Sequence, residues 1–307
     1  MTGTNDGSRE AELGIPLSWY QVAWSDALGA GDVQRLRAFG RDWVIFRDES
    51  GEVGVLEAHC PHLGAHFAEG GTVAGDSLVC PFHGWRWRTN GECSAIPYAK
   101  RIPAQARAES LQVCERFGMI FCWFHPRGEE PLFELPDLPE WGAEGWPREW
   151  VHRDIELATH PQEIAENGPD WRHLASVHKM EMAEDDFVFE PNGFGYRWFL
   201  GGTVSEGEST LEGMNYGMGL STFRQGGVHD ALVLTTVTPI EVDRVHFRLS
   251  MLSRAPAEEQ QTQFGYHWEF AAPDFEIWEH KIHRPRPLLC PEDGPIAQFR
   301  AWASDFY

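Results

Sequence analysis

The sequence predicts an α+β fold in which an all-β first half is followed by a second half of mixed strands and helices. The chain has 307 residues, which is more than a single hydrophobic core usually supports. A proline-rich stretch over residues 126–147 separates the two halves, and such a stretch is typical of an extended connector. A hydrophobic content of 42% is ample for two cores. We therefore expect a domain boundary in this stretch.

Short apolar runs separated by turn residues occupy the chain from about residue 19 to residue 124. Runs of this length with such punctuation predict short β-strands. Residues 48–51 and the pair Asn90-Gly91 each lie between two apolar runs. Their turn chemistry predicts two hairpins. The first half is therefore expected to be an all-β module.

The second half contains both the helical and the strand-like spacing of apolar residues. A helix is expected around residues 170–179, and strands are expected over 209–223, 231–240 and 244–252. Two further helices, over 274–283 and 295–307, are each preceded by a proline or a capping residue.

The chain is strongly acidic, with 25 Lys and Arg against 47 Asp and Glu and a formal charge of −22. Such a surface repels phosphate backbones and anionic lipid headgroups, so nucleic acid and membranes are not expected partners. No apolar run reaches the length of a membrane span, and the polar start over residues 1–14 lacks a signal-peptide core. Six Cys are too sparse for a disulfide scaffold. We expect a cytoplasmic protein with reduced thiols.

A first metal constellation consists of two boxes, Cys60-Pro61-His62 and Cys80-Pro81-Phe82-His83, with 17 residues between them. Each box ends a strand-like run and can form a tight loop that presents both of its ligands. Two thiolates and two imidazoles suit a structural Zn²⁺, and they also suit a [2Fe-2S] cluster in which Cys hold one iron and His the other. The ligand types alone leave both alternatives open.

The surroundings of the boxes favour the cluster. A proline follows each Cys, glycines stand at 64 and 84, and Trp85 follows the second His. This arrangement resembles the Rieske ferredoxin fold, and the resemblance implies that Cys60, His62, Cys80 and His83 hold a [2Fe-2S] cluster. A zinc knuckle is the structural alternative, and a colourless zinc-loaded protein would support it.

A second constellation lies in the segment from Asn167 to His178, in which His173 and His178 stand five residues apart. Non-haem Fe²⁺ sites use two imidazoles and one carboxylate and leave positions open for O₂ and substrate. On an ideal helix a five-residue step leaves the two His about 140° apart. Both reach one metal only if the helix is bent or carries a π-bulge. Asp170 projects from nearly the same face as His173, within reach of a ligand imidazole.

The pattern N-x-x-D-x-x-H-x4-H downstream of the Cys/His boxes resembles the oxygenase components of Rieske non-haem iron oxygenases. The C-terminal stretch is similar to the 3-ketosteroid 9α-hydroxylase and cholesterol 7-desaturase branch. The resemblance makes His173 and His178 ligands of a mononuclear Fe²⁺ and includes Asn167 in the motif. It makes Asp170 an inter-subunit electron-transfer bridge and Asp293 the third ligand, with Glu292 as second choice.

This resemblance implies a Rieske domain over residues 15–130 and a catalytic domain over 146–307 of the helix-grip type, a curved antiparallel sheet with helices. It implies a homotrimer in which His62 or His83 contacts Asp170 of a neighbouring chain. Electrons would come from an NADH-dependent flavin and iron–sulfur reductase. The expected reaction is O₂-dependent hydroxylation of a hydrophobic, steroid- or sterol-like substrate.

Two alternatives stay open at this point. The same ligands serve desaturation or oxidative demethylation. A Rieske electron carrier without catalytic iron is a different class, but it would not need His173, His178 and Asp293. The substrate pocket is expected between the ligand helix and the sheet. Five side chains are candidates to line it, although each alone is more often a core residue: Trp198, Met214, Tyr216, Met218 and Phe223.

Overall fold

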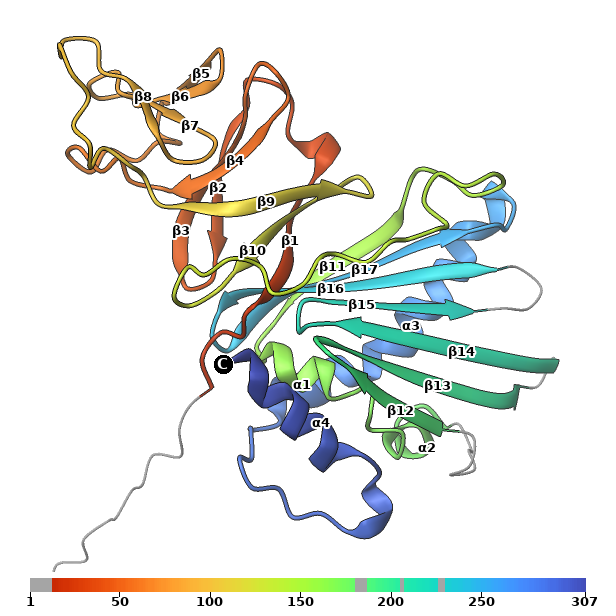
Figure 1. Ribbon diagram of the computed structural model, residues 1–307. Coiled ribbons are helices and arrows are strands. Elements are labelled where there is room, and N and C mark those ends of the chain that lie inside the picture. The colour runs from red at the N-terminus through yellow and green to blue at the C-terminus, as the bar shows by residue number, and fades with distance from the viewer. Residues whose placement is uncertain (1–12, 180–186, 205–206, 226–229) are drawn as a thin grey trace, which may run out of the picture.

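The computed structural model describes residues 13–179, 187–204, 207–225 and 230–307. The described residues form three antiparallel sheets, two in the first half of the chain and one in the second (Figure 1). The polar start considered above lies almost wholly outside the described residues. Among the helices that are described, none has the length and apolar character of a membrane span.

The first sheet has six strands in the order β1-β10-β9-β4-β3-β2. Asp48 shapes the turn between β3 and β4, because its Oδ1 accepts hydrogen bonds from the backbone N–H groups of Ser50 (2.9 Å) and Glu52 (2.8 Å). The hairpin predicted at residues 48–51 is thus confirmed. The strands of this sheet are β1 (Ser18–Trp24), β2 (Val33–Ala38), β3 (Arg41–Arg47), β4 (Val53–Glu57), β9 (Ser110–Arg116) and β10 (Met119–Phe124), and the short 3-10 helix η1 (Ser25–Ala27) follows β1.

A small four-stranded sheet is inserted between β4 and β9 and carries the second Cys/His box. The Asn90-Gly91 hairpin is confirmed: Gly91 adopts a φ of +82°, which favours glycine, and Asn90 Oδ1 accepts from Glu92 N at 3.0 Å. The strands are β5 (Thr72–Ala74), β6 (Ser77–Val79), β7 (Arg86–Arg88) and β8 (Cys93–Ala95), in that order.

The proline-rich connector contains no helix or strand over residues 125–150, all of which are described. Aromatic side chains fix it to the first sheet. Trp150 donates its indole N–H to the carbonyl of Phe117 at 2.8 Å and stacks on Trp141 with ring centroids 5.6 Å apart. The absence of helix and strand over residues 125–150 agrees with the connector that the sequence predicts.

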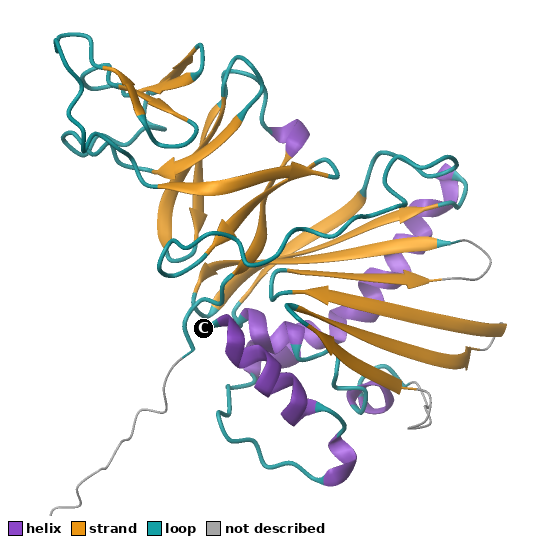
Figure 2. Ribbon diagram, in the orientation of Figure 1, coloured by secondary structure: helices purple, strands orange, loops and turns teal. Residues whose placement is uncertain are grey.

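The second half is built on a seven-stranded sheet in the order β11-β17-β16-β15-β14-β13-β12. The strands expected over 231–240 and 244–252 are confirmed, whereas the segment expected as strand over 209–223 belongs to two strands joined by a turn at residues 217–219. The sheet is curved, and the long helix α3 (Ala257–His280) lies along one face of it (Figures 1 and 2). Its strands are β11 (Val151–Leu157), β12 (Phe187–Asn192), β13 (Gly195–Val204), β14 (Gly207–Tyr216), β15 (Leu220–Gln225), β16 (Ala231–Glu241) and β17 (Arg244–Ser253).

Apolar side chains hold α3 on the sheet. Phe264, Phe275 and Trp278 of α3 are buried in one cluster with Val233 and Phe247 of the strands. A curved sheet that holds one long helix is the helix-grip arrangement, so the predicted fold class is confirmed. The helices are α1 (Pro161–Ala165), α2 (His173–Ser176), α3 (Ala257–His280) and α4 (Ile296–Ala303), with 3-10 turns η3 (Pro291–Asp293) and η4 (Ser304–Phe306).

Two helix predictions were wrong in their bounds. The helix expected over 274–283 is only the last part of α3, which begins at Ala257 and contains Pro273 in its interior. A proline there removes one intrahelical hydrogen bond, but the packing of α3 on the sheet outweighs that loss. The helix expected around 170–179 is the single turn α2.

Strand β1 joins the two halves. The side-chain Oε1 of Gln21 accepts a hydrogen bond from Thr236 Oγ1 at 2.7 Å. The backbone carbonyl of Gln21 accepts one from Arg248 Nη1 at 3.1 Å. Gly219 meets β1 so closely that a Cβ there would lie 2.2 Å from the carbonyl oxygen of Trp19. One buried cluster contains side chains of both halves. The two halves are therefore held in a fixed relation within one chain.

Candidate metal centres

The two Cys/His boxes form loops with the same hydrogen-bonding pattern. In each loop the Cys carbonyl accepts from a glycine N–H four residues later, at 2.9 Å for Cys60 and Gly64 and at 3.0 Å for Cys80 and Gly84. Both glycines have positive φ, +76° and +69°, a conformation that other residues adopt at a steric cost. The glycines noted in the sequence therefore close the turns that present the ligands.

The loops place both thiols inside and both imidazoles at the edge. Cys60 and Cys80 are 2% and 3% exposed, whereas His62 and His83 are half-buried with ring centroids 4.8 Å apart. Burial raises the pKa of the Cys60 thiol to about 11, because a thiolate is poorly solvated there. A buried thiolate pair fits a cationic metal centre, which supplies the missing charge compensation.

The spacing of the four side chains separates the cluster from the zinc alternative. A tetrahedral Zn²⁺ brings its ligand atoms close together. Within the described part of the chain, only one group of three or more such side chains has all ligand atoms within 4.8 Å of one another, and it includes none of these four. The ligand atoms of the two boxes are therefore not gathered as closely as a single ion requires. A two-iron cluster needs such a wider set of ligands.

Two tryptophans cover this centre. Trp85 stacks on the His62 ring with centroids 4.4 Å apart and donates its indole N–H to Tyr98 Oη at 2.8 Å. Trp87 is fully buried beside Cys60, and its Nε1 has no hydrogen-bond partner among the described residues. A buried indole N–H without a partner beside the thiols is consistent with a cluster whose sulfur atoms accept hydrogen bonds.

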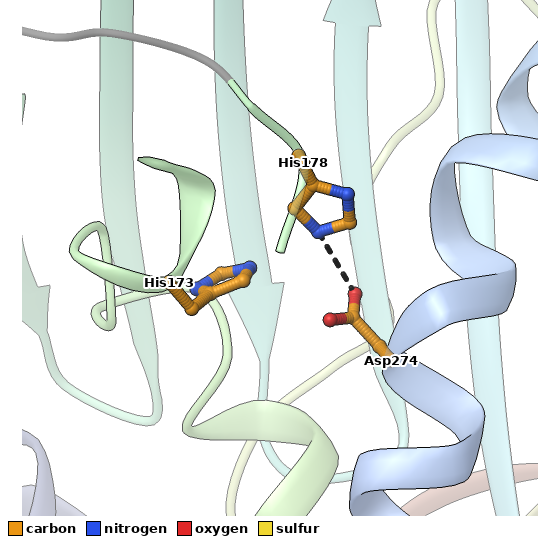
Figure 3. Close-up of side chains that lie close together, drawn as sticks. All are labelled: His173, His178 and Asp274. Carbon is orange, nitrogen blue, oxygen red and sulfur yellow. Dashed lines mark ion pairs between the residues drawn. The ribbon is translucent and has the colours of Figure 1, made fainter. Parts of the chain in front are cut away.

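The group within 4.8 Å consists of His173, His178 and Asp274 (Figure 3). His178 Nε2 lies 3.3 Å from Asp274 Oδ2, and both side chains are buried, at 2% and 7% exposure. His178 Nε2 has no hydrogen-bond partner among the described residues. A buried carboxylate facing two imidazoles, with no Lys or Arg beside it among the interactions described, fits a bound cation. Two His and one carboxylate are the ligand set of non-haem Fe²⁺.

The structure corrects the third ligand. Asp293, predicted beside the two histidines, instead closes the 3-10 turn η3, where its Oδ2 accepts from Cys290 N at 2.7 Å. Glu292 lies in the same turn and is exposed. The structure therefore does not bring Asp293 to the two histidines, and the carboxylate that lies beside them is that of Asp274. Sequence reasoning missed Asp274 because the local pattern predicts a helix start after Pro273 rather than one helix over 257–280.

Neighbouring groups orient the first histidine. The carbonyl of Asp170 accepts from His173 Nδ1, which leaves Nε2 directed toward the other two side chains. Asn167 Nδ2 lies 3.2 Å from both His173 Nε2 and Asp274 Oδ2. The Asp170 contact thus comes from the backbone, whereas the sequence favoured its carboxylate. Asn167 and Asp170 both border the site.

The expected helix distortion takes another form. The helix α2 ends at Ser176, and the backbone N–H groups of Val177 and His178 still bond four residues back, at 2.7 and 3.1 Å. Lys179 then adopts a φ of +59° and ends the run. The two imidazoles converge, with centroids 5.1 Å apart, without a π-bulge. Of the two expected distortions, a bend or a π-bulge, the π-bulge does not occur in this described segment.

A cavity of about 580 Å³ adjoins the three side chains, between α2, α3 and the sheet. Its walls are mostly apolar, and they include Trp198 and Phe223 from the strands, as the sequence predicts. Met218 is instead buried in the core, and Met214 and Tyr216 do not line the cavity. Volume and lining suit a small apolar molecule.

Two family models match the chain. Residues 18–106 match the Rieske [2Fe-2S] domain, and residues 122–307 match the 3-ketosteroid 9alpha-hydroxylase C-terminal domain. A probable 3-ketosteroid-9-alpha-monooxygenase, oxygenase component, from Rhodococcus rhodochrous is 31% identical over 100% of this chain and 84% of its own. The cholesterol 7-desaturase nvd 1 of Ciona intestinalis is 31% identical over 95% of this chain and 69% of its own.

Solved structures share the fold. A dicamba monooxygenase bound to dicamba superposes with a TM-score of 0.75 at 16% identity over 94% of this chain and 96% of its own. NdmA of Pseudomonas putida CBB5 with caffeine superposes with a TM-score of 0.75 at 16% identity, over 93% of this chain and 89% of its own. The two family models and the relatives at 31% identity show that the chain belongs to the Rieske oxygenases with a 3-ketosteroid 9α-hydroxylase type C-terminal domain, oxidoreductases that carry a [2Fe-2S] cluster and a non-haem iron.

Proposed function

We propose that this chain is the terminal oxygenase of a Rieske monooxygenase system that hydroxylates a steroid- or sterol-like substrate. The observation that carries the proposal is the apolar cavity of about 580 Å³ into which His173, His178 and Asp274 converge. The relatives named above, a ketosteroid monooxygenase component and a cholesterol desaturase, support the substrate class. An electron carrier without catalytic iron would have no use for this convergence.

In this proposal, Cys60, His62, Cys80 and His83 hold the cluster, and His173, His178 and Asp274 hold the iron. When bound, the iron supplies O₂ activation with electrons that arrive through the cluster. This assignment keeps the six ligands predicted from the two Cys/His boxes and from the histidine pair. It replaces Asp293 with Asp274.

The remaining side chains of the site position groups and exclude water. The Asp170 carbonyl holds the His173 imidazole through Nδ1, so that Nε2 is available as a ligand. Asn167 lies 3.2 Å from Asp274 Oδ2 and directs that carboxylate. The ring of Phe270 stacks on His178 with centroids 4.0 Å apart and restricts the imidazole. Apolar walls keep bulk water away from the substrate carbon that reacts.

The assembly and the redox partner belong to the same proposal. An oxygenase component needs a reductase, and we infer an NADH-dependent flavin and iron–sulfur enzyme that works in the cytoplasm. We infer a homotrimer in which Asp170 of one chain connects to His62 or His83 of the next. The half-buried state of His62 and His83 supports this, because their rings are accessible at the edge of the fold. Closed rings of this kind make catalysis depend on assembly.

Asp170→Asn tests the bridge in the purified holoenzyme. Substrate-triggered oxidation of the reduced cluster, followed by its visible absorbance in a single turnover, should slow strongly, whereas sedimentation should still give the mass of a trimer. Asp293→Asn, outside the proposed electron path, is the control and should oxidise the cluster at the wild-type rate. An Asp170→Asn rate equal to wild type, or a monomeric wild-type protein, would refute the corresponding part.

Turnover tests the function as a whole. The holoenzyme, a surrogate Rieske reductase and NADH are incubated with androstenedione, cholesterol and a small aromatic acid. We expect O₂ uptake only with the steroid or the sterol, and a product that has gained one oxygen atom. Loss of two hydrogens instead would identify a desaturase with the same ligands. Oxidation of the aromatic acid alone would sink the proposed substrate class.

A further inference from the structure

We infer that His267 is a specificity-determining residue that binds a ketone or hydroxyl oxygen of the substrate. This inference rests on the proposed function. Two buried side-chain nitrogens in the wall of the cavity have no hydrogen-bond partner among the described residues, Nε2 of His178 and Nε2 of His267. The first is explained by the metal site. The second belongs to a residue that lines the same cavity and is not one of the proposed ligands.

The position of His267 relative to the metal site follows from the helix. His267 and Asp274 are both on α3, seven residues apart, which is close to two full turns. They therefore project from nearly the same face of the helix, separated by roughly 10 Å along its axis. An apolar molecule lying along α3 would present one end to His267 and an inner carbon to the iron ligands. Such a distance suits a fused-ring skeleton better than a small aromatic ring.

The surroundings of His267 favour a neutral hydrogen-bonding role. Phe223 packs edge-on against its ring, with centroids 5.5 Å apart. Burial lowers the pKa of His267 to about 4, so the imidazole is uncharged near neutral pH. A neutral imidazole has one donor nitrogen and one acceptor nitrogen. It can thus donate to a ketone, or donate to or accept from a hydroxyl, but it offers no charge to a carboxylate.

A polar atom left without a partner in an apolar wall discriminates strongly between ligands. A molecule that satisfies the nitrogen gains a hydrogen bond, whereas its analogue without the oxygen leaves the nitrogen buried and unpaired. The residue thereby decides which way round the substrate lies in the cavity. The carbon that reaches the iron follows from that orientation.

The test measures binding in the ferrous holoenzyme without O₂ or reductase, so that no turnover occurs. Dissociation constants are determined by equilibrium dialysis for androstenedione and for its two analogues that each lack one keto oxygen. In the wild type, one analogue should bind about three- to tenfold more weakly than the dione. In His267→Leu the dissociation constant of the dione should rise by a similar factor. The dione should then bind no more tightly than that analogue. His267→Gln, which keeps a donor, should recover part of the dione's advantage.

His280→Leu is the matched control, because it makes the same change on α3 at an exposed position outside the cavity. It should retain the wild-type preference, and cluster absorbance and iron content verify that each variant is loaded. If His267→Leu weakens all three steroids equally, or retains the preference, the inference is wrong while the proposed function stands. If the wild type binds none of the three steroids, the proposed substrate class fails as well.

Discussion

The carboxylate of Asp274 lies 3.3 Å from Nε2 of His178 (Figure 3), although Asp274 belongs to the long helix α3 and His178 lies two residues after the single turn α2. Both side chains are buried, and one ligand atom each from His173, His178 and Asp274 lie within 4.8 Å of one another. The proposed metal site depends on the Asp274 side chain, because it adds a carboxylate to the two histidines.

Removing Asp274 should remove the mononuclear iron. In Asp274→Ala, iron analysis should find only the two cluster irons, with the visible absorbance of the Rieske cluster unchanged, because the two histidines alone bind Fe²⁺ weakly. Asp293→Ala is the control. It loses only the bond to Cys290 N, at a cost of about 0.5–2 kcal/mol for a cap, and should keep the additional iron. The reverse pattern would restore Asp293 as the ligand.

Trp87→Phe should lower the reduction potential of the Rieske cluster. The buried indole N–H has no partner among the described residues, and a hydrogen bond to a cluster sulfur stabilises the reduced form. A bond worth about 0.5–1.5 kcal/mol corresponds to roughly 20–60 mV for one electron. Redox titration followed by circular dichroism measures the shift.

Trp85→Phe is the comparison for that shift, because the indole N–H of Trp85 already bonds to Tyr98. We expect its potential to lie closer to the wild-type value than that of Trp87→Phe. Equal potentials for Trp87→Phe and the wild type would show that the indole does not reach the cluster sulfur atoms.

Two glycine substitutions should change stability in opposite directions. Gly219→Ala places a Cβ 2.2 Å from the Trp19 carbonyl, so β1 must move, at a cost of about 1–3 kcal/mol. Gly265 lies inside α3, and the position that an added methyl group would take has open space around it. Gly265→Ala should therefore stabilise by about 0.5–1 kcal/mol. Urea denaturation of both variants measures the free energies of unfolding, and a stabilised Gly219→Ala would contradict the close approach of the two halves.

His267 should make the folded state sensitive to acid. Burial lowers its pKa from 6.5 to about 4 in the folded chain. As the pH falls below about 6.5, the unfolded chain takes up a proton that the folded chain does not, so stability is lost. Between pH 7 and pH 5 this group should cost about 2 kcal/mol. The unfolding free energy of the wild type should fall by that much more than that of His267→Leu, and parallel pH profiles would exclude the effect.

The local features of this protein could be predicted from its amino-acid sequence. The two hairpins follow from turn residues such as Asn90 and Gly91, whose φ preferences act within a few residues. The Rieske boxes and the histidine pair are likewise short motifs, because their ligands are brought together by one or two loops. Individual strands and the connector could be predicted from strand periodicity and proline content, whereas the curvature of the sheet is expected only from the family resemblance.

The proposed third ligand, Asp274, and the imidazole of His267 in the cavity wall depend instead on long-range packing. Asp274 and His267 meet the site because α3 runs unbroken through Pro273 and packs on the sheet through Phe264, Phe275 and Trp278. Local preference places a helix start after that proline. The burial of apolar surface over the whole helix overrides this preference, and it depends on strands distant in the chain.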